Sequence, residues 1–159
     1  MAADMTVPCG EGYLNIRVGA IIMREGKVLM VGSGEEPEYY YSVGGRLHFG
    51  ETAEEAIVRE VYEETGAALE IDRLGFVLEN YFTADYGAKR GKLIYELSFF
   101  YYMKTPEGFD PPLRFREGES EETLYWVDPS APVRYYPEFF RTELSQSSEG
   151  VKVICADER

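Results

Sequence analysis

The feature that most constrains this chain is one strongly helical segment set among runs of strand-type sequence. Apolar side chains within residues 52–65 recur at helical spacing, at Ala53, Ala56, Ile57 and Val61. Thr52 and Glu55 stand at the two positions of a capping box, and Gly66 follows where a left-handed residue commonly ends a helix. The pattern predicts a helix over 52–65 that packs one face against a core.

Strand-type runs lie on both sides of this helix. They cover residues 14–23, 27–31, 39–43, 74–82, 92–103, 124–127 and 151–155. Residues 24–26 join the first two runs as a hairpin turn. The acid-rich residues 107–122 are expected to form an exposed loop, and residues 137–144 a second helix that begins with Pro137. This order predicts an α+β fold in which a mixed sheet carries packed helices.

Length and composition fit a single domain over residues 1–159, with residues 1–12 as a loosely ordered N-terminal segment. A hydrophobic content of 45% is enough to build a core. No run approaches the length of a membrane span, and no secretion signal is visible. Cys9 and Cys155 are far apart and are expected to be reduced. The expected location is the cytoplasm.

The net charge of -13, from 29 acidic against 16 basic residues, restricts the partners of the chain. Sequence-independent binding to nucleic acid needs a basic face, and so does binding to an anionic membrane, so both are excluded. A phosphate-bearing partner must instead be held by a local device, such as a bound cation or a small basic loop. We therefore expect a small-molecule partner.

Three carboxylates of the helix share one face. Glu60, Glu63 and Glu64 are spaced i, i+3 and i+4, and this arc lies close to the apolar stripe, so full solvation of all three is not expected. A divalent cation would relieve their repulsion, and an all-oxygen set favours Mg²⁺ or Mn²⁺ over Ca²⁺. The alternative for such a charge run is a solvated helix face without a ligand.

Residues 45–67, GRLHFGETAEEAIVREVYEETGA, resemble the signature of the Nudix hydrolase family. That signature runs Gly, five residues, Glu, seven residues, then Arg-Glu-aliphatic-any-Glu-Glu-any-Gly-aliphatic. The matching positions are Gly45, Glu51, Arg59, Glu60, Val61, Glu63, Glu64 and Gly66. Ala67 is smaller than the usual aliphatic residue, and Val43 stands where many members have Pro. The resemblance implies an α/β/α sandwich and hydrolysis of a nucleoside diphosphate linked to another group, X.

The resemblance also implies roles for single residues. The carboxylates of Glu60, Glu63 and Glu64 and the backbone carbonyl of Gly45 would be metal ligands. Arg59 would orient a carboxylate, with Glu51 and Glu63 as its expected partners. A glutamate would act as general base, Glu63 as the first choice and Glu60 as the second. The family often adds an acid from a later loop, for which the candidates are Glu117, Glu119, Glu121 and Glu122.

Basic side chains outside the helix are candidates for phosphate binding. Arg17 on an early strand and Arg46 beside Gly45 are expected to contact phosphates. Lys89 and Arg90 belong to a basic loop that could bind substrate or could equally be a solvated hairpin loop.

The substrate itself is left open by the sequence. No Pro occurs between Pro37 and Pro106, where ADP-ribose hydrolases of the family commonly carry one, so a (d)NTP or a small nucleotide derivative is favoured by elimination. The alternatives are an ADP-ribose or NDP-sugar diphosphatase and a non-catalytic module that senses a nucleotide. The intact carboxylate set argues against the sensor. The aromatic run at 95–102 could form a homodimer face or part of the core.

Overall fold

The computed structural model of the chain describes residues 2–146 and 149–159. Strands are the predominant secondary structure: β1 (Thr6–Cys9), β2 (Gly12–Ile21), β3 (Met23–Arg24), β4 (Lys27–Ser33), β5 (Tyr40–Arg46), β6 (Ile71–Thr83), β7 (Leu93–Met103), β8 (Arg114–Glu117), β9 (Ser120–Val127), β10 (Tyr135–Tyr136) and β11 (Lys152–Asp157). The helices are α1 (Ala53–Thr65) and the short α2 (Phe140–Glu143), with a 3₁₀ turn, η1, at Gly87–Lys89.

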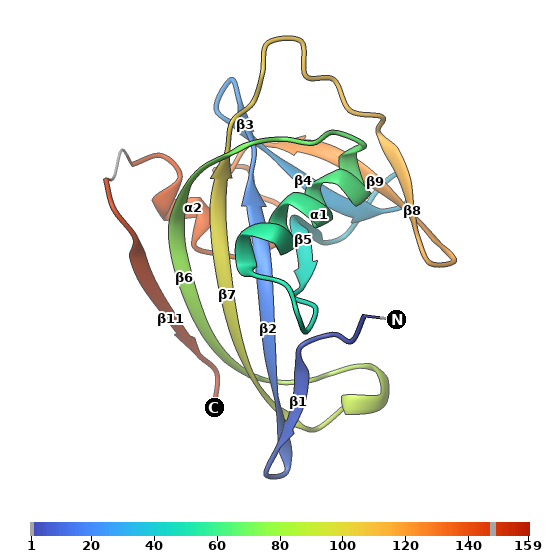
Figure 1. Ribbon diagram of the computed structural model, residues 1–159, viewed down its shortest axis with the longest axis vertical. Coiled ribbons are helices and arrows are strands. Elements are labelled where there is room, and N and C mark those ends of the chain that lie inside the picture. Colours follow the sequence, from blue (N-terminus) through green and yellow to red (C-terminus); the bar gives the residue numbers. More distant parts are fainter. Residues whose placement is uncertain (1, 147–148) are drawn as a thin grey trace.

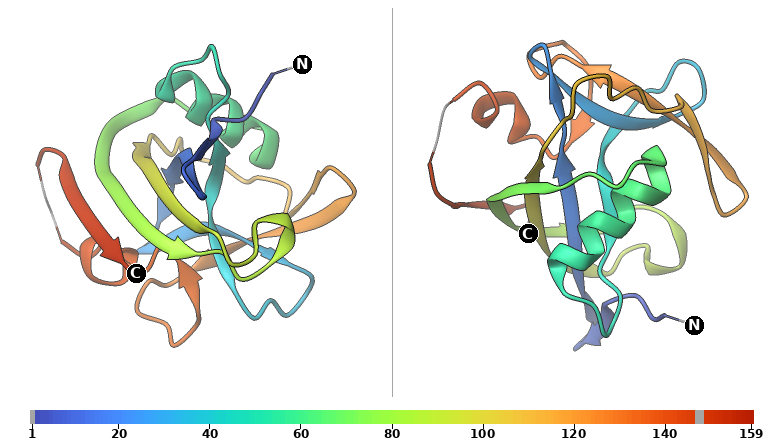
Figure 2. Two further views of the ribbon diagram at one scale, coloured as in Figure 1. Left: turned by 90° about the horizontal axis from the view of Figure 1, so that it is seen from below. Right: turned by 45° about the horizontal axis from the view of Figure 1, so that its top comes forward.

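The strands join into one mixed sheet in the order β11-β6-β7-β2-β5-β4-β9-β8. β2 is parallel to β7 and β11 is parallel to β6, whereas the other neighbours along this path are antiparallel. Figure 1 shows β2, β6 and β7 side by side with α1 crossing in front of the sheet. The sheet curves strongly, as the view from below in Figure 2 shows. α1 contacts β5, β2 and β8, so these three strands define its surroundings.

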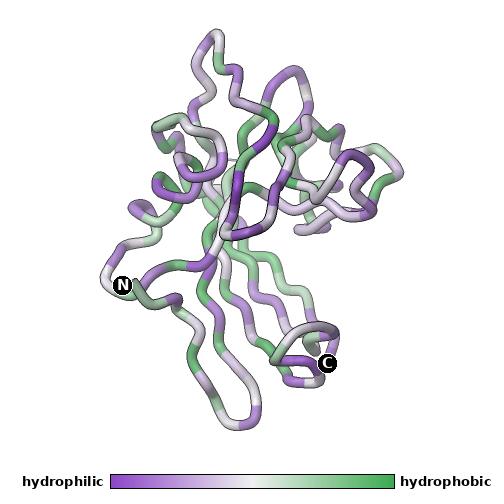
Figure 3. Tube along the Cα trace, turned by 90° about the vertical axis from the view of Figure 1, so that its right-hand side faces the viewer, coloured by the Kyte–Doolittle hydropathy of each residue, from purple (hydrophilic) through white to green (hydrophobic). Residues whose placement is uncertain are grey.

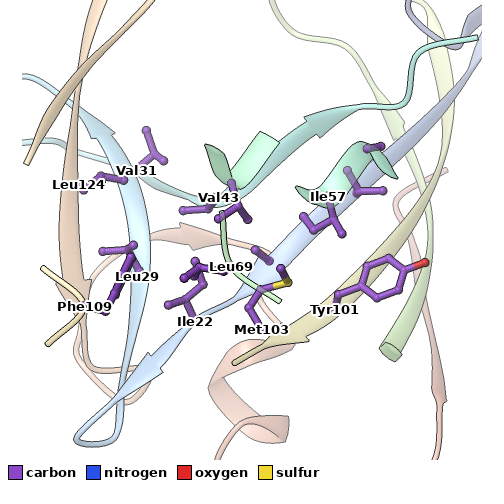
Figure 4. Packing of buried hydrophobic residues seen from close by; sticks show 14 residues of the cluster. Ile22, Leu29, Val31, Val43, Ile57, Leu69, Tyr101, Met103, Phe109 and Leu124 are labelled. Carbon is purple, nitrogen blue, oxygen red and sulfur yellow. The ribbon is translucent and has the colours of Figure 1, made fainter. Parts of the chain in front are cut away.

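The predicted helix forms with the caps that its sequence specifies. The Thr52 side chain accepts a hydrogen bond from the Glu55 backbone N–H, the Glu55 side chain accepts one from the Thr52 N–H, and Gly66 ends the helix at φ 75°. The apolar stripe packs into a core with strand residues such as Val43, and Figure 4 shows Val43 and Ile57 within this cluster. Burial of this stripe fixes which face of α1 turns toward the sheet.

A second core lies on the opposite face of the sheet. Phe140 of α2 is fully buried there, against residues of β6 and β7 such as Phe76 and Phe100. Figure 3 shows hydrophobic and hydrophilic residues alternating along the strands, which is the pattern that supplies both faces. A mixed sheet with a helix on either face confirms the expected α+β sandwich.

The expectation of an exposed loop over 107–122 is wrong for its second half. β8 and β9 form an antiparallel hairpin there, with Gly118 in the turn at φ 61°. β9 also pairs with β4 along its length, and Phe115 packs against the first core. The acidic composition of this stretch does not predict strands. These strands form because strand pairing and packing stabilise them, and not because their residues have high strand propensity.

The N-terminal expectations also need correction. Within the segment expected to be loosely ordered, β1 pairs with β2 through a turn at Gly10. The expected strand over 14–23 is two strands, β2 and β3, of which only β3 pairs with β4. The hairpin turn itself is confirmed, since Glu25 and Gly26 both have positive φ, at 51° and 78°.

The second predicted helix is shorter than expected. Of residues 137–144 only α2 is helical, and it follows β10, which pairs with β5. The Arg141 guanidinium donates to the backbone carbonyls of Ala131 and Val133, so side-chain hydrogen bonds order much of this region. No helix among residues 2–146 and 149–159 is both long and apolar enough to cross a membrane.

Candidate functional site

The carboxylate face of α1 lies directly against the backbone at the end of β5. A Cβ atom on Gly45 would stand 2.5 Å from Oε1 of Glu60, so a side chain at this position would require a shift. The Gly44 N–H donates a hydrogen bond to Oε1 of Glu64 at 3.3 Å. The absence of a side chain at Gly45 therefore permits the close approach of Glu60, and the Gly44 N–H holds Glu64 against β5.

Arg59 is anchored by Glu51, the acid at the N-terminal side of α1. Nη2 of Arg59 donates to Oε1 of Glu51 at 2.6 Å, and Nε donates to Oε2 at 3.1 Å. Nη2 also reaches the carbonyl oxygen of Arg46 at 3.1 Å. The hydrogen bond from Arg59 lowers the pKa of Glu51, and the same bond raises the pKa of Arg59. Glu51 thus acts as a support that fixes a guanidinium at the edge of the site.

The remaining nitrogen of this guanidinium reaches the other acids of the motif. Nη1 of Arg59 lies 2.8 Å from Oε1 of Glu60 and 3.4 Å from Oε2 of Glu63. The expected pairing of Arg59 with Glu51 and Glu63 is present, and the contact with Glu60 is added to it. One guanidinium therefore offsets part of the repulsion that the spacing of these acids creates.

Two of the three carboxylates on the Glu60, Glu63 and Glu64 face of α1 are buried. Glu60 is 7% exposed and Glu64 is 6% exposed, whereas the Glu63 side chain is 53% exposed. Burial raises the pKa of Glu60, and it raises the pKa of Glu64 well above the ordinary value, with the neighbouring Glu60 and Glu117 adding to the effect. Oε2 of Glu64 is buried and has no hydrogen-bond partner among the residues described. Holding these acids in the ionised form is therefore unfavourable without a bound cation.

A cavity of about 560 Å³ opens beside these carboxylates. Its lining combines Asp4, Arg17, Val31, Tyr41, Ser42, Gly44, Gly45, Arg46, His48, Arg59, Glu60, Glu63, Glu64, Glu117 and Glu122. Arg17 and Arg46 are directly opposite each other in the β2–β5 ladder, so their side chains lie on the same face of the sheet. The cavity thus presents acids from α1 together with two neighbouring arginines from the sheet.

Most residues singled out in the sequence come together here. Gly45, Arg46, Arg59 and the three α1 glutamates line the cavity with Arg17, and Glu51 supports Arg59 from behind. Of the four acids proposed from 117–122, Glu117 and Glu122 line the cavity. Lys89 and Arg90 do not line it, although Lys89 is close enough to Arg46 for that charge to lower the Lys89 pKa, after the larger effect of desolvation.

Sequence reasoning missed the residues that reach the cavity through tertiary contacts. Asp4 lies 3.4 Å from Nη1 of Arg46 and 3.4 Å from Nε2 of His48. Its place is fixed by backbone hydrogen bonds from Met5 to Leu47 and from Phe49 to Ala3. No spacing in the sequence relates Asp4 to the motif, so only strand pairing reveals it.

The donor set fits a divalent cation by its chemistry. All side-chain donors are hard carboxylate oxygens, and the buried, unpartnered Oε2 of Glu64 is an oxygen that a cation would satisfy. As the side chains stand, no three Asp, Glu, His or Cys residues among 2–146 and 149–159 converge on one point. The hydrogen bonds of Arg59 account for this, because they turn Glu60 and Glu63 toward the guanidinium.

Comparison with known proteins adds independent findings. Residues 14–144 match the family model described as NUDIX domain. The chain is similar to a MutT NUDIX hydrolase from Burkholderia pseudomallei, with 26% identity, a TM-score of 0.62, and coverage of 85% of this chain and 98% of that one. It also resembles a MutT protein from Bacillus halodurans, with 17% identity, a TM-score of 0.67, and 91% of each chain covered.

A third similar structure is an ADP-ribose pyrophosphatase from Streptococcus suis 89-1591. It shows 16% identity and a TM-score of 0.56, and the alignment covers 87% of this chain and 98% of that chain. At this identity the likeness concerns the fold alone. No curated protein matches the sequence significantly.

Proposed function

The chain belongs to the NUDIX domain family and is a hydrolase of phosphorus-containing acid anhydrides, and on that premise we propose that its substrate is a nucleoside diphosphate linked to a further group. The observation that carries the proposal is the pairing, within one cavity, of the α1 carboxylates with Arg17 and Arg46 of the sheet. A diphosphate needs both a counter-charge and a site for a cation, and this cavity offers residues for each.

Glu60, Glu63, Glu64 and the carbonyl of Gly45 are the groups that would hold Mg²⁺ or Mn²⁺. Such an ion, when bound, supplies Lewis-acid activation of water and neutralisation of phosphate charge. Arg59 keeps Glu60 and Glu63 within reach of each other, and Glu51 holds Arg59 by two hydrogen bonds. Glu117, whose charge acts on Glu60 and Glu64, is our candidate for the additional acid from the later segment.

Glu63 is the proposed general base, with Glu60 as the second candidate. The Glu63 carboxylate is more than half exposed, so water reaches it, and within residues 2–146 and 149–159 its side chain makes polar contact only with Arg59, at 3.4 Å. Glu60 is buried and held at 2.8 Å by the same guanidinium. A base must accept a proton from water at a carboxylate oxygen, and the freer carboxylate meets that requirement better.

We favour a (d)NTP or a small nucleotide derivative as the substrate. An ADP-ribose or NDP-sugar substrate is the alternative within the same reaction, and one similar structure is an ADP-ribose pyrophosphatase. A non-catalytic nucleotide sensor is the alternative outside it. The acids of α1 argue against a sensor, because burial of Glu60 and Glu64 destabilises the metal-free protein without serving nucleotide recognition.

A screen in which alkaline phosphatase releases phosphate from the products of cleavage, with the substrates themselves resolved by chromatography, tests this proposal. (d)NTPs, NDP-sugars, ADP-ribose, dinucleoside polyphosphates and coenzyme A would each be incubated with the protein in Mg²⁺ and in Mn²⁺. We expect turnover of at least one compound, loss of turnover in EDTA, and loss of turnover in Glu60→Gln with Glu64→Gln combined. If no compound is cleaved while one of them raises the Tm, the sensor replaces the hydrolase.

We further propose that residues 1–159 form one catalytic domain that works in the cytoplasm, as a monomer or a homodimer. The apolar residues of β7 contribute to both cores, which supports a structural role for much of the aromatic run once considered as a dimer face. Sedimentation of the purified protein at several concentrations distinguishes the two oligomeric states.

A further inference from the structure

A buried polar cluster lies beside Arg17, outside the motif that carries the metal-binding acids. Its centre is Glu96 of β7, which is 6% exposed. Asn15 Nδ2 donates to one carboxylate oxygen at 3.3 Å, and the Tyr136 hydroxyl donates to the other at 3.1 Å. Two neutral donors from two other strands thus hold this carboxylate in one orientation.

Arg17 connects this cluster to the cavity. Its Nε lies 3.9 Å from Oε1 of Glu96, while its side chain is 35% exposed and lines the cavity. The Arg17 side chain donates no hydrogen bond to any residue within 2–146 or 149–159, so its terminal nitrogens have no acceptor in that part of the chain. A guanidinium held on its Nε side keeps its outer nitrogens for a phosphate.

A second carboxylate competes for the same guanidinium. Arg17 and Glu64 line the same cavity, so a proposed metal ligand lies within electrostatic reach of the guanidinium. Without an opposing anion, Arg17 would be drawn toward the α1 acids, where it would pair with Glu64 instead of a substrate phosphate. Glu96, whose Oε1 lies 3.9 Å from Nε of Arg17, supplies that opposing anion.

We propose that Glu96 is a positioning residue that holds Arg17 away from the α1 carboxylates and aims its free nitrogens into the cavity. The inference rests on the proposed function, because it takes Arg17 to be a phosphate-binding residue. It adds a residue that lies outside the signature motif and whose side chain does not line the cavity.

Glu96→Gln is the informative variant. It removes the charge and keeps the shape, and the cluster can accommodate it because Oδ1 of Asn15 is buried without a hydrogen-bond partner among the described residues. A turn of the Asn15 amide would offer that oxygen to the new Gln amide. Tyr136→Phe, which removes one donor to Glu96 without changing its charge, serves as a second and milder variant.

The chain provides a matched control on the other face of the same sheet. Glu79 of β6 accepts a hydrogen bond from the Tyr95 hydroxyl at 2.9 Å, which repeats the Glu–Tyr pairing away from Arg17 and the cavity. Glu79→Gln therefore removes an equivalent charge and an equivalent hydrogen-bond acceptor without changing the contact between Glu96 and Arg17.

The test measures the Kd of inorganic pyrophosphate by calorimetry in Mg²⁺ buffer, together with KM and kcat for a cleaved substrate. We expect Glu96→Gln to weaken pyrophosphate binding and raise KM about threefold to tenfold, within the range of coupled neighbouring residues. Tyr136→Phe should shift both less, and Glu79→Gln should change neither. In an Arg17→Gln background, Glu96→Gln should have no further effect.

Unchanged pyrophosphate binding in Glu96→Gln overturns the inference. An equal loss of pyrophosphate affinity with and without Arg17 also overturns it, since Glu96 would then not act through Arg17. If Glu96→Gln fails to fold, Tyr136→Phe in the same two backgrounds decides. If the wild type binds pyrophosphate and cleaves a substrate, and Glu96→Gln has the same Kd and KM as the wild type, the role of Glu96 is refuted but the proposed function stands. A wild type that binds no pyrophosphate and cleaves nothing refutes the proposed function as well.

Discussion

The α1 acids and the sheet arginines meet in one cavity but arise in different ways. Glu60, Glu63 and Glu64 lie within one helical turn, so the period of the helix alone brings them together. Arg17 and Arg46 meet because β2 and β5 pair in register, and each then faces an acid from another part of the chain. One half of the site is a local motif, and the other half is a product of tertiary pairing.

The two regions also differ in electrostatic balance. The α1 face holds two buried carboxylates with raised pKa values and one guanidinium among them. On the sheet face each arginine has a facing carboxylate, one buried at Glu96 and one exposed at Asp4. The carboxylates of the α1 face therefore repel one another, and a cation would relieve this repulsion. On the sheet face the charge of each arginine is already paired with a carboxylate before any ligand binds.

The largest effect should come from the proposed base on the α1 face. Glu63→Gln is expected to lower kcat by at least about 100-fold, the lower end for loss of a general base, because the amide cannot accept a proton from water. Steady-state kinetics on the substrate found by the screen measures this. Glu54→Gln, an exposed substitution in the first turn of α1, is the control. Near-normal turnover in folded Glu63→Gln would show that Glu63 is not the general base. Glu60→Gln would then be tested in the same way.

Arg59→Lys should give the next largest effect, on stability. Lysine keeps the charge but loses the two-point pairing with Glu51, and this leaves buried Glu60 poorly compensated. We expect the free energy of unfolding to fall by about 1–3 kcal/mol, as for loss of a partly buried charged hydrogen bond. Urea denaturation of the metal-free protein measures it, against Arg116→Lys on exposed β8. Equal stability of the two variants would show that Arg59 does not hold the α1 face together.

The pH dependence of metal-free stability separates raised from lowered pKa values. Glu64 has a folded-state pKa above its ordinary value of 4.5, so the stability it contributes is present below that value and lost as the pH rises through the folded pKa. Glu51 has a lowered pKa, so its contribution is present above 4.5 and lost as the pH falls through the folded pKa. The two residues therefore act in opposite directions and in different pH windows.

Thermal denaturation in EDTA at several pH values tests this contrast. At neutral pH, Glu64→Gln should have a Tm about 2–4 °C above the wild type, the shift that about 1 kcal/mol produces in a chain of this size. The difference should shrink toward pH 4.5, where the wild-type carboxyl is protonated. A variant less stable than the wild type at neutral pH would mean that the Glu64 charge does not strain the metal-free fold.

The smallest effect should come from the exposed acid on the sheet face. Asp4 pairs with Arg46 but is 47% exposed at its side chain, so it competes with an arriving phosphate instead of fixing the arginine rigidly. Asp4→Asn is expected to lower KM by about threefold or less, the range of an exposed ion pair, and the effect should vanish at high salt. Glu11→Gln controls for the change in net charge. A raised KM would make Asp4 a positioning residue like Glu96.

Local signals predicted the α1 half of the site well. The helix over 52–65 needed only its apolar spacing, its capping box and Gly66, and all three appear as expected. The expectation that these acids are not all fully solvated is confirmed by the burial of Glu60 and Glu64, whereas Glu63 is exposed. Strand runs were recognisable, but their partners were not, since the pairing of β2 with β7 joins segments far apart in the sequence.

The failures have a common physical cause. β8 and the start of β9 fall in the stretch 107–122, which is expected to be a loop because it holds six acids, yet pairing of β9 with β4 and packing of Phe115 outweigh composition. β1 and Asp4 were passed over because nothing local marks them. In each case the stabilising contact is made with residues that are distant in the sequence, so short-range sequence patterns do not predict it.

The sequence by itself therefore determined the helix, the acid cluster on one of its faces, the family and the class of reaction, since each of these depends on spacing within a few turns of chain. Tertiary structure alone decided which arginine side chains share the cavity with those acids and which acids of residues 117–122 line it. It also decided that Asp4 lies beside Arg46 and Glu96 beside Arg17. Spacing fixes geometry along one helix, whereas charge pairing across strands depends on how the sheet is ordered and in what register.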